Sequence, residues 1–185
     1  MKKILGLILM GCLLSSMAFA QNNIQWTTIE VASQMKKENN KMFFVDFYTT
    51  WCGWCKQMDK DVFSDSTIIK IMNKYYVPVK FNAEGTSEFT WKGTKYTGTE
   101  VPRGTRPVLH SFTKAMLGKR LGFPSFVIYD KTQANVMLLE GYQPVEDLTI
   151  TLWYYASGDH RKYSFEKYKT IFDKDIRPVM NASLK

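Results

Sequence analysis

Two cysteines three positions apart, directly after a strongly apolar segment, constrain the fold of this chain more than any other feature. Residues Lys41 to Tyr48 contain the run Met-Phe-Phe-Val-Asp-Phe-Tyr, which is rich in strand-forming residues. Cys52 and Cys55 follow at once, and residues Gly53 to Asp61 are expected to begin a helix. The sequence therefore predicts a buried central strand that ends at a cysteine pair and continues into a helix.

A cysteine pair at the start of a helix is suited to thiol–disulfide exchange. Unsatisfied N–H groups and the helix dipole stabilise a thiolate there, and the thiolate is the nucleophilic form of cysteine. Cys52 is therefore predicted to attack, and Cys55, one turn deeper, to resolve the mixed disulfide. This chemistry needs no cofactor, and none is expected. Trp51 is expected to shield one side of the sulfur and to offer a surface to a substrate.

Two other uses of the cysteine pair are weaker. A purely structural disulfide between Cys52 and Cys55 would close a very small loop and add little stability. A zinc site needs four ligands, but beyond the first twenty residues the sequence adds only His110 and His160, without metal-ligand spacing. No metal is therefore expected.

The first twenty residues have the pattern of a signal peptide. Lys2 and Lys3 precede an apolar run from Ile4 to Leu14, which is too short for a membrane span. The small residues of Ala18-Phe19-Ala20 predict cleavage before Gln21. We therefore expect residues 1–20 to be removed, residues 21–185 to form one domain, and the protein to be exported to the periplasm.

A second export route is open for the same segment. Leu9-Met10-Gly11-Cys12 resembles a bacterial lipobox, in which Cys12 would carry the lipid and anchor the protein to a membrane. Met10 departs from the small residue usual at its position. The soluble periplasmic form is favoured, with a lipoprotein anchored through Cys12 as the alternative.

Charge and composition exclude several classes of protein. Hydrophobic residues make up 45% of the 185 residues, which is enough for a core and argues against wholesale disorder. The net charge is +8, but basic residues are dispersed among acidic ones and form no concentrated stripe. No nucleic-acid partner is therefore expected. No heptad or other dimer segment is visible, so a monomer is expected.

The pattern along the chain predicts an α/β fold with a central mixed β-sheet covered by helices on both faces. Residues Glu84 to Arg106 differ in composition and are expected to form an inserted hairpin or loop. Beyond the cysteine helix, the other predicted helices lie within Thr27 to Lys37, Thr67 to Tyr75, Pro107 to Leu117, Val145 to Ala156 and Ser164 to Asp175, and the other strands at Tyr76 to Ala83, Ser125 to Tyr129 and Val136 to Glu140. Pro107 is placed in the first turn of its helix. Pro78 suggests an edge strand or an early strand position.

The segment Asp46-Phe47-Tyr48-Thr49-Thr50-Trp51-Cys52-Gly53-Trp54-Cys55-Lys56 resembles the active-site segment of the thioredoxin superfamily. With Val62-Phe63-Ser64-Asp65, it is similar in particular to the thioredoxin-like domain of DsbD-type transmembrane reductases and related exported proteins. Gly122-Phe123-Pro124-Ser125 resembles the family's cis-proline loop. The resemblance spans about residues 41–156, interrupted by the insertion, and implies a thioredoxin-like fold with an extra C-terminal helix.

The resemblance implies roles for three further residues. Asp46 matches the buried aspartate that accepts a proton from the resolving thiol. Its apolar neighbours would independently raise its pKa toward that of a useful base. An ordinary aspartate at the end of a strand is the alternative. Lys80 matches the lysine beside that aspartate, or is a surface lysine on an edge strand. Pro124 matches the cis-proline beside the disulfide, or is a trans-proline at the start of a strand.

The sequence favours a reductant and leaves other functions open. The dipeptide Gly53-Trp54 supplies no histidine beside the thiols, so one cation that would stabilise the thiolate is missing. Phe123 before Pro124 resembles thioredoxin-like reductases. We therefore expect reduction of disulfides in client proteins, with electrons from a membrane donor. A disulfide isomerase is an alternative. A binding or chaperone module with secondary redox activity, using Trp51, Trp54 and Phe123 as its surface, is another.

Overall fold

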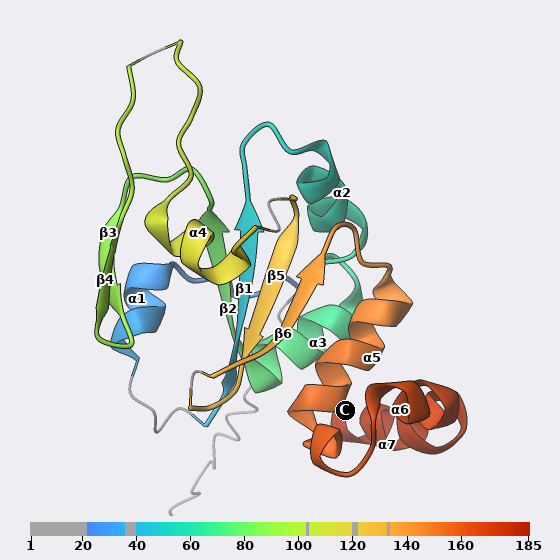
Figure 1. The fold of residues 1–185 in the computed structure, drawn as a ribbon. Helices are drawn as coiled ribbons and strands as arrows, with labels where there is room; N and C mark the ends of the chain where they lie inside the picture. Colours follow the sequence, from blue (N-terminus) through green and yellow to red (C-terminus); the bar gives the residue numbers. More distant parts are fainter. Residues whose placement is uncertain (1–21, 36–39, 103, 120–121, 133) are drawn as a thin grey trace, which may run out of the picture.

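The computed structural model describes residues 22–35, 40–102, 104–119, 122–132 and 134–185 (Figure 1). The predicted signal peptide and Cys12 lie outside the described residues. The strands are β1 (Met42–Tyr48), β2 (Tyr76–Asn82), β3 (Glu88–Trp91), β4 (Thr94–Thr97), β5 (Ser125–Tyr129) and β6 (Asn135–Glu140). The α-helices are α1 (Ile29–Gln34), α2 (Gly53–Asp61), α3 (Ser66–Tyr75), α4 (Ser111–Leu117), α5 (Val145–Ala156), α6 (Phe165–Ile171) and α7 (Arg177–Ser183).

The central sheet is mixed, as the sequence predicts. Its strand order is β2-β1-β5-β6, with β1 parallel to β2 and the other neighbouring pairs antiparallel. The parallel pair is joined by a crossover through α2 and α3, because parallel neighbours cannot be connected by a tight turn. Pro78 lies in β2 at one end of this order, which confirms the edge-strand prediction. Thr27 forms a parallel bridge to Val79 there and covers part of the exposed edge.

The sheet is buried on both faces because side chains alternate along β1. Phe44 packs on one side with residues of α3, α5 and the C-terminal helices, whereas Phe43 and Phe47 pack on the other with α1, α4 and the β3–β4 hairpin. Figure 1 shows these two layers on opposite sides of the sheet. This double burial explains why β1 is almost continuously apolar.

The inserted hairpin is confirmed as a separate two-stranded antiparallel sheet of β3 and β4. Phe89 and Trp91 are buried and join the core cluster that contains α1 and α4. His110 also ties the insertion down, since its backbone N–H donates to the carbonyl of Ala83 at 2.8 Å. The inserted segment therefore begins after Ala83 and ends at His110, and these two residues are neighbours in space.

The predicted helix from Pro107 is wrong at its start. Helix α4 begins at Ser111, and Pro107 lies in the preceding loop rather than in a first turn. His110 is the N-cap, because its Nδ1 accepts from the backbone N–H of Phe112 at 3.0 Å. One of the free N–H groups at the start of the helix, that of Phe112, is thus satisfied by the side chain of a buried histidine.

The C-terminal region contains more helix than the single segment expected over residues 164–175. Helix α6 is followed by a π-helical turn, Phe172–Ile176, and then by α7, with Pro178 in its first turn. A proline has no N–H to donate in a helix interior, and here the wide π-helical turn directly precedes the turn that contains Pro178. None of the helices within the described residues combines the length and hydropathy needed to cross a membrane.

Candidate active site

The cysteine pair lies at the start of α2, shortly after the end of β1. Cys52 is the N-cap of α2, and its Sγ accepts a hydrogen bond from the backbone N–H of Cys55 at 3.0 Å. The backbone N–H of Cys52 in turn donates to the carbonyl of Thr49 at 3.2 Å. The attacking sulfur assigned from the sequence is therefore placed among N–H groups at the positive end of a helix, where a thiolate is stabilised.

The two cysteines form a disulfide. The sulfurs are 2.08 Å apart and the Cα atoms 5.3 Å apart. In this oxidised form both residues are buried, with Cys52 3% and Cys55 4% exposed. Exposure therefore does not distinguish the attacking thiol from the resolving one, and the distinction rests on their positions at the helix terminus.

Two exposed tryptophans, one before the cysteine pair and one between the two cysteines, are held by different contacts. Trp51 and Trp54 are each 64% exposed. The indole N–H of Trp51 donates to the two carboxylate oxygens of Glu84 at 3.0 and 3.2 Å. The ring of Trp54 lies 5.8 Å from that of Tyr142. Both side chains thus expose a large apolar surface to solvent, and each is also held by one contact, Trp51 by Glu84 and Trp54 by Tyr142.

The predicted proline loop meets the same region. The Phe123–Pro124 peptide bond is cis, as the resemblance implies. The ring of Phe123 stands edge-on to that of Trp51, with centroids 6.2 Å apart and planes 80° apart. The carbonyl of Pro124 accepts from the N–H of Gly141 at 2.8 Å, which ties the loop to the end of β6. The structure therefore brings the residue before Cys52 together with the proline loop.

Asp46 is a buried carboxylate inside the sheet. It is 1% exposed, and the register of β1 and β2 places it opposite Lys80. Its Oδ2 lies 2.7 Å from Lys80 Nζ, whereas Oδ1 has no hydrogen-bond partner among the described residues. Burial raises the pKa of Asp46 to about 6, although the Lys80 ammonium opposes the change. Asp46 is therefore able to gain or lose a proton close to neutral pH.

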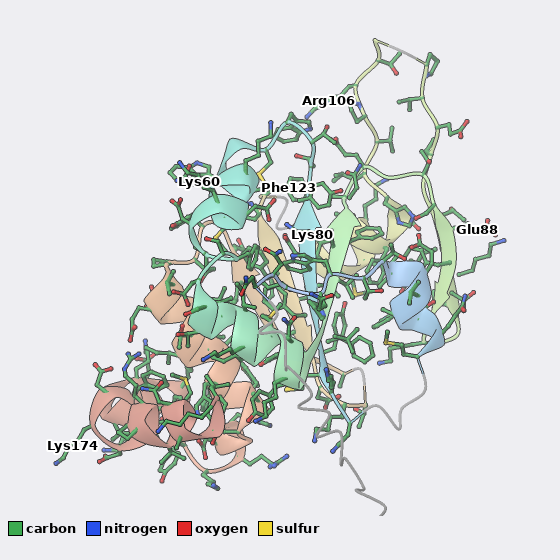
Figure 2. The ribbon with its side chains drawn as sticks, turned by 180° about the vertical axis from the view of Figure 1, so that it is seen from behind. Lys60, Lys80, Glu88, Arg106, Phe123 and Lys174 are labelled. Atoms are coloured by element: carbon green, nitrogen blue, oxygen red, sulfur yellow. A yellow bond between two sulfur atoms is a disulfide. The ribbon has the colours of Figure 1, made fainter. Side chains whose placement is uncertain are left out.

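Lys80 is partly buried and serves two carboxylates. Its ammonium contacts Asp46 on β1 and also Asp59 on α2. Three aromatic rings surround the same nitrogen, those of Trp26, Phe63 and Tyr48, at 4.8, 5.1 and 5.5 Å. Burial lowers the pKa of Lys80, but the two carboxylates outweigh it and the net change is upward. The choice that the sequence left open is settled in favour of a lysine paired with Asp46 (Figure 2 labels Lys80).

Sequence reasoning missed three of these contacts. Asp59 lies one helical turn after Cys55, and that spacing on a helix was a usable signal for a neighbour of the site. Glu84 follows β2 and Tyr142 follows β6, and these two strands finish at the same end of the sheet. No local pattern around Glu84 or Tyr142 marks either residue as a neighbour of a tryptophan more than thirty positions away.

Metal-ligating side chains do not gather in the part of the chain that the structure describes. The buried His110 uses both ring nitrogens for structure: Nδ1 accepts from Phe112, and Nε2 is 2.9 Å from the carbonyl of Ser87. Because Nδ1 is an acceptor, the proton is assigned to Nε2, which donates to Ser87. This histidine joins the hairpin region to α4, and both of its ring nitrogens are used in these structural contacts.

A model of the thioredoxin-like domain family matches residues 29–156, which is more than half of the chain. The chain belongs to this family. The match contains the cysteine pair, Asp46, Lys80 and Pro124, and it ends before the C-terminal helices α6 and α7. The superfamily and the fold class expected from the sequence are therefore confirmed.

A solved structure shares this fold. A thioredoxin-fold protein of Helicobacter pylori is 15% identical, with a TM-score of 0.54, over 90% of this chain and 92% of that protein. The C-terminal domain of Neisseria meningitidis DsbD, in its oxidised form, is also similar, at 15% identity and a TM-score of 0.40, over 68% of this chain and 86% of that domain.

A curated relative is similar over a shorter stretch. It is an uncharacterised protein of Caenorhabditis elegans, 35% identical over 66 residues, which are 35% of this chain and 9% of that protein. The chain thus spans about a tenth of the length of this relative. Membership of the thioredoxin-like family, together with the Cys52–Cys55 pair, supports the class of thiol–disulfide oxidoreductases.

Proposed function

We propose that this thioredoxin-like protein is an exported thiol–disulfide oxidoreductase that reduces disulfides in client proteins. The observation that carries the proposal is the position of Cys52, which caps α2 and accepts the N–H of Cys55 while bonded to its sulfur. The helix terminus favours the thiolate of Cys52, and Cys55 is within bonding distance for the return step.

The proposed reaction balances without a cofactor. In the reduced protein, the Cys52 thiolate attacks one sulfur of a client disulfide, a mixed disulfide forms, and the other client sulfur leaves as a thiolate. The Cys55 thiol then loses its proton and attacks the Cys52 sulfur, which releases the second client thiolate. The client gains two electrons and two protons, and the protein is left with the Cys52–Cys55 disulfide.

Asp46 is the proposed acceptor of the Cys55 proton. Support comes from its raised pKa of about 6 and from its free Oδ1 within the described residues. Pro124, Trp51, Trp54 and Phe123 are proposed to contact the client chain. Trp51 and Trp54 adjoin the cysteines in the sequence, and Phe123, next to Pro124, packs against Trp51. Lys80 acts on Asp46 rather than on the sulfurs, through its ion pair.

The reducing direction is supported by the charges near Cys52. Gly53 and Trp54 between the cysteines bring no cation, and the carboxylate of Glu84 faces the neighbouring Trp51. A negative charge on that side disfavours the thiolate, which makes the reduced form a better electron donor. Measurement of the redox equilibrium with glutathione tests the direction: a reductant remains largely oxidised at a glutathione ratio that leaves an oxidant reduced.

Insulin reduction by the mature chain, with dithiothreitol as electron source, tests the activity. Wild type is expected to be active, and Cys52→Ser to lose at least about a thousand-fold because it lacks the nucleophile. Cys55→Ala should accumulate mixed disulfides that Cys52→Ala does not form. Reduction that survives Cys52→Ser would overturn the proposal.

The exposed Trp51 and Trp54 also favour the second candidate, a binding module. Its signature is suppression of client aggregation that survives Cys52→Ser. Isomerase activity is separated by refolding of a scrambled disulfide protein, in which an isomerase restores native pairing and a simple reductant leaves free thiols.

Export to the periplasm and electron supply from a membrane donor belong to the same proposal. They rest on the pattern of residues 1–20 and on the need to reduce the disulfide after each turnover. Mass spectrometry of the exported protein tests the route. A chain beginning at Gln21 supports the soluble form, and a diacylglyceryl mass on Cys12 would replace it with the lipoprotein.

A further inference from the structure

The insertion forms one wall of a cleft beside the redox pair. The cleft has a volume of about 370 Å³, within the range of small ligand sites. It is bordered by Thr50 on the β1–α2 loop and by the insertion, and its polar lining consists of Thr50, Asn82, Glu84, Thr86, Thr99 and Glu100. Figure 1 shows the loop between β4 and α4 extending past the end of the sheet at which β1 meets α2.

The cleft lies close to the redox pair in the chain. Its lining residue Thr50 is two residues before Cys52, and Trp51 between them donates a hydrogen bond to Glu84, another lining residue. An extended chain advances about 3.3 Å per residue. A client whose cysteine is bonded to Cys52 can therefore place side chains two or three residues away in this cleft.

The negative charge of the cleft determines which client side chains would bind there. Its two ionisable lining residues, Glu84 and Glu100, are acidic, and neither forms an ion pair with a lysine or arginine among the described residues. The hydroxyl and amide groups around them can hydrogen-bond a peptide backbone. Arg106, labelled in Figure 2, is adjacent in the chain to the lining residue Pro107 and carries an opposing charge.

We propose that this cleft is a specificity site for client segments that carry lysine or arginine within three residues of the reacting cysteine. The inference rests on the proposed function, because it assigns a class of substrate to the same disulfide. Acidic residues at those client positions would meet Glu84 and Glu100 and be disfavoured.

Single-turnover reduction of disulfide-linked peptide dimers by the reduced protein tests the proposal. The peptides differ only in having lysine, glutamine or glutamate at the three positions on either side of the cysteine, and products are counted by mass spectrometry after acid quenching. The lysine peptide should react about five-fold faster than the glutamine peptide at low salt, the glutamate peptide more slowly, and 0.5 M NaCl should reduce the difference.

Matched variants locate the effect. Glu100→Gln should cut the lysine preference by about half, since it removes one of two carboxylates. Glu88→Gln, an exposed change on the hairpin at a residue that pairs with Lys95 and does not line the cleft, should leave the preference unchanged. Arg106→Gln should increase the preference, because it removes the opposing charge.

Two negative outcomes are distinguishable. Equal rates for all three peptides, or a preference unaffected by Glu100→Gln, would overturn the cleft as a specificity site. Hydroxyethyl disulfide, which is uncharged, serves as the reference substrate. If the wild-type protein reduces neither it nor any peptide, the proposed function itself fails.

Discussion

The inner and outer sides of the Cys52–Cys55 disulfide region differ in what their side chains can do. The inner side holds a charge network in which Lys80 joins the buried Asp46 to the half-exposed Asp59. The outer side exposes Trp51 and Trp54. Changes on the inner side should alter proton transfer and stability, whereas changes on the outer side should alter client binding at nearly constant stability.

The largest effect expected on the inner side comes from Asp46→Asn. Loss of the proposed base should slow resolution of the mixed disulfide about a hundred-fold at pH 7 and leave the first attack by Cys52 nearly intact. Rapid-quench separation of the two steps measures this difference. A change confined to the first attack would instead indicate an electrostatic role for Asp46.

The same variant should be more stable near neutral pH. Burial raises the pKa of Asp46 from 3.8 to about 6, so the folded state holds this proton more tightly than the unfolded state. Stability therefore falls as pH rises from about 4 to 6, by up to about 3 kcal/mol at pH 7. Urea unfolding should show that Asp46→Asn gains stability at pH 7 and little at pH 3.5. Strong destabilisation at both pH values would make Asp46 a structural partner of Lys80.

Lys80→Met tests whether the Lys80 ammonium controls the pKa of Asp46 on the inner side. Lys80 lowers the pKa of Asp46 against the effect of burial, so removing the ammonium should raise that pKa further. The midpoint of the pH profile for the resolution step should move upward by about one pH unit. A profile that stays in place would show that another group sets it. Lys80→Arg, which keeps the charge, is the matched control.

Trp51→Ala and Trp54→Ala test the outer side. Each should raise the KM for a protein client about ten-fold, because exposed tryptophans contribute large contact area to binding. The free energy of unfolding should change by less than about 0.5 kcal/mol, since both side chains are mostly exposed. Tyr163→Ala, an exposed aromatic change before α6, should leave KM unaltered. A large loss of stability would show that the tryptophans support the fold, as residues of the inner side do, and would contradict this prediction.

Asp59→Asn should give the smallest effect. The negative charge of Asp59 raises the pKa of Asp46, and its removal leaves Lys80 to Asp46 alone. The midpoint of the resolution step should therefore move downward, by a few tenths of a pH unit because Asp59 is half exposed and screened. An upward movement, measured in the same assay, would contradict this sign.

The central elements could be predicted from sequence because their signals are local. The apolar run of β1 and the cysteine pair fix where the strand ends and α2 begins, and Gly53–Asp61 matches the prediction. The pairing of Asp46 with Lys80 could not be derived locally, since it depends on the parallel register of β1 and β2. The family resemblance suggested it, and the register explains it.

The features that the sequence did not predict correctly also depend on contacts between distant parts of the chain. Pro107 resembles a residue of a first helical turn, yet α4 starts later because His110 is held between Ala83, Ser87 and Phe112 by tertiary contacts. The contact between Trp51 and Glu84 was missed because it joins a loop to an insertion 33 positions away. Sequence periodicity carries no information about such long-range partners.

The return of the insertion to its starting point has an evolutionary consequence. Ala83 and His110 are joined by a backbone hydrogen bond, so the chain between them can change in length without altering the strand order of the main sheet. Phe89 and Trp91 fasten the inner part of this excursion to the core. A Cβ at Gly98 would clash with the carbonyl oxygen of Gly85, so replacement of the loop is least constrained beyond Gly98. Under the proposed role of the cleft, client preference can therefore diversify by loop replacement while the cysteine pair is inherited unchanged.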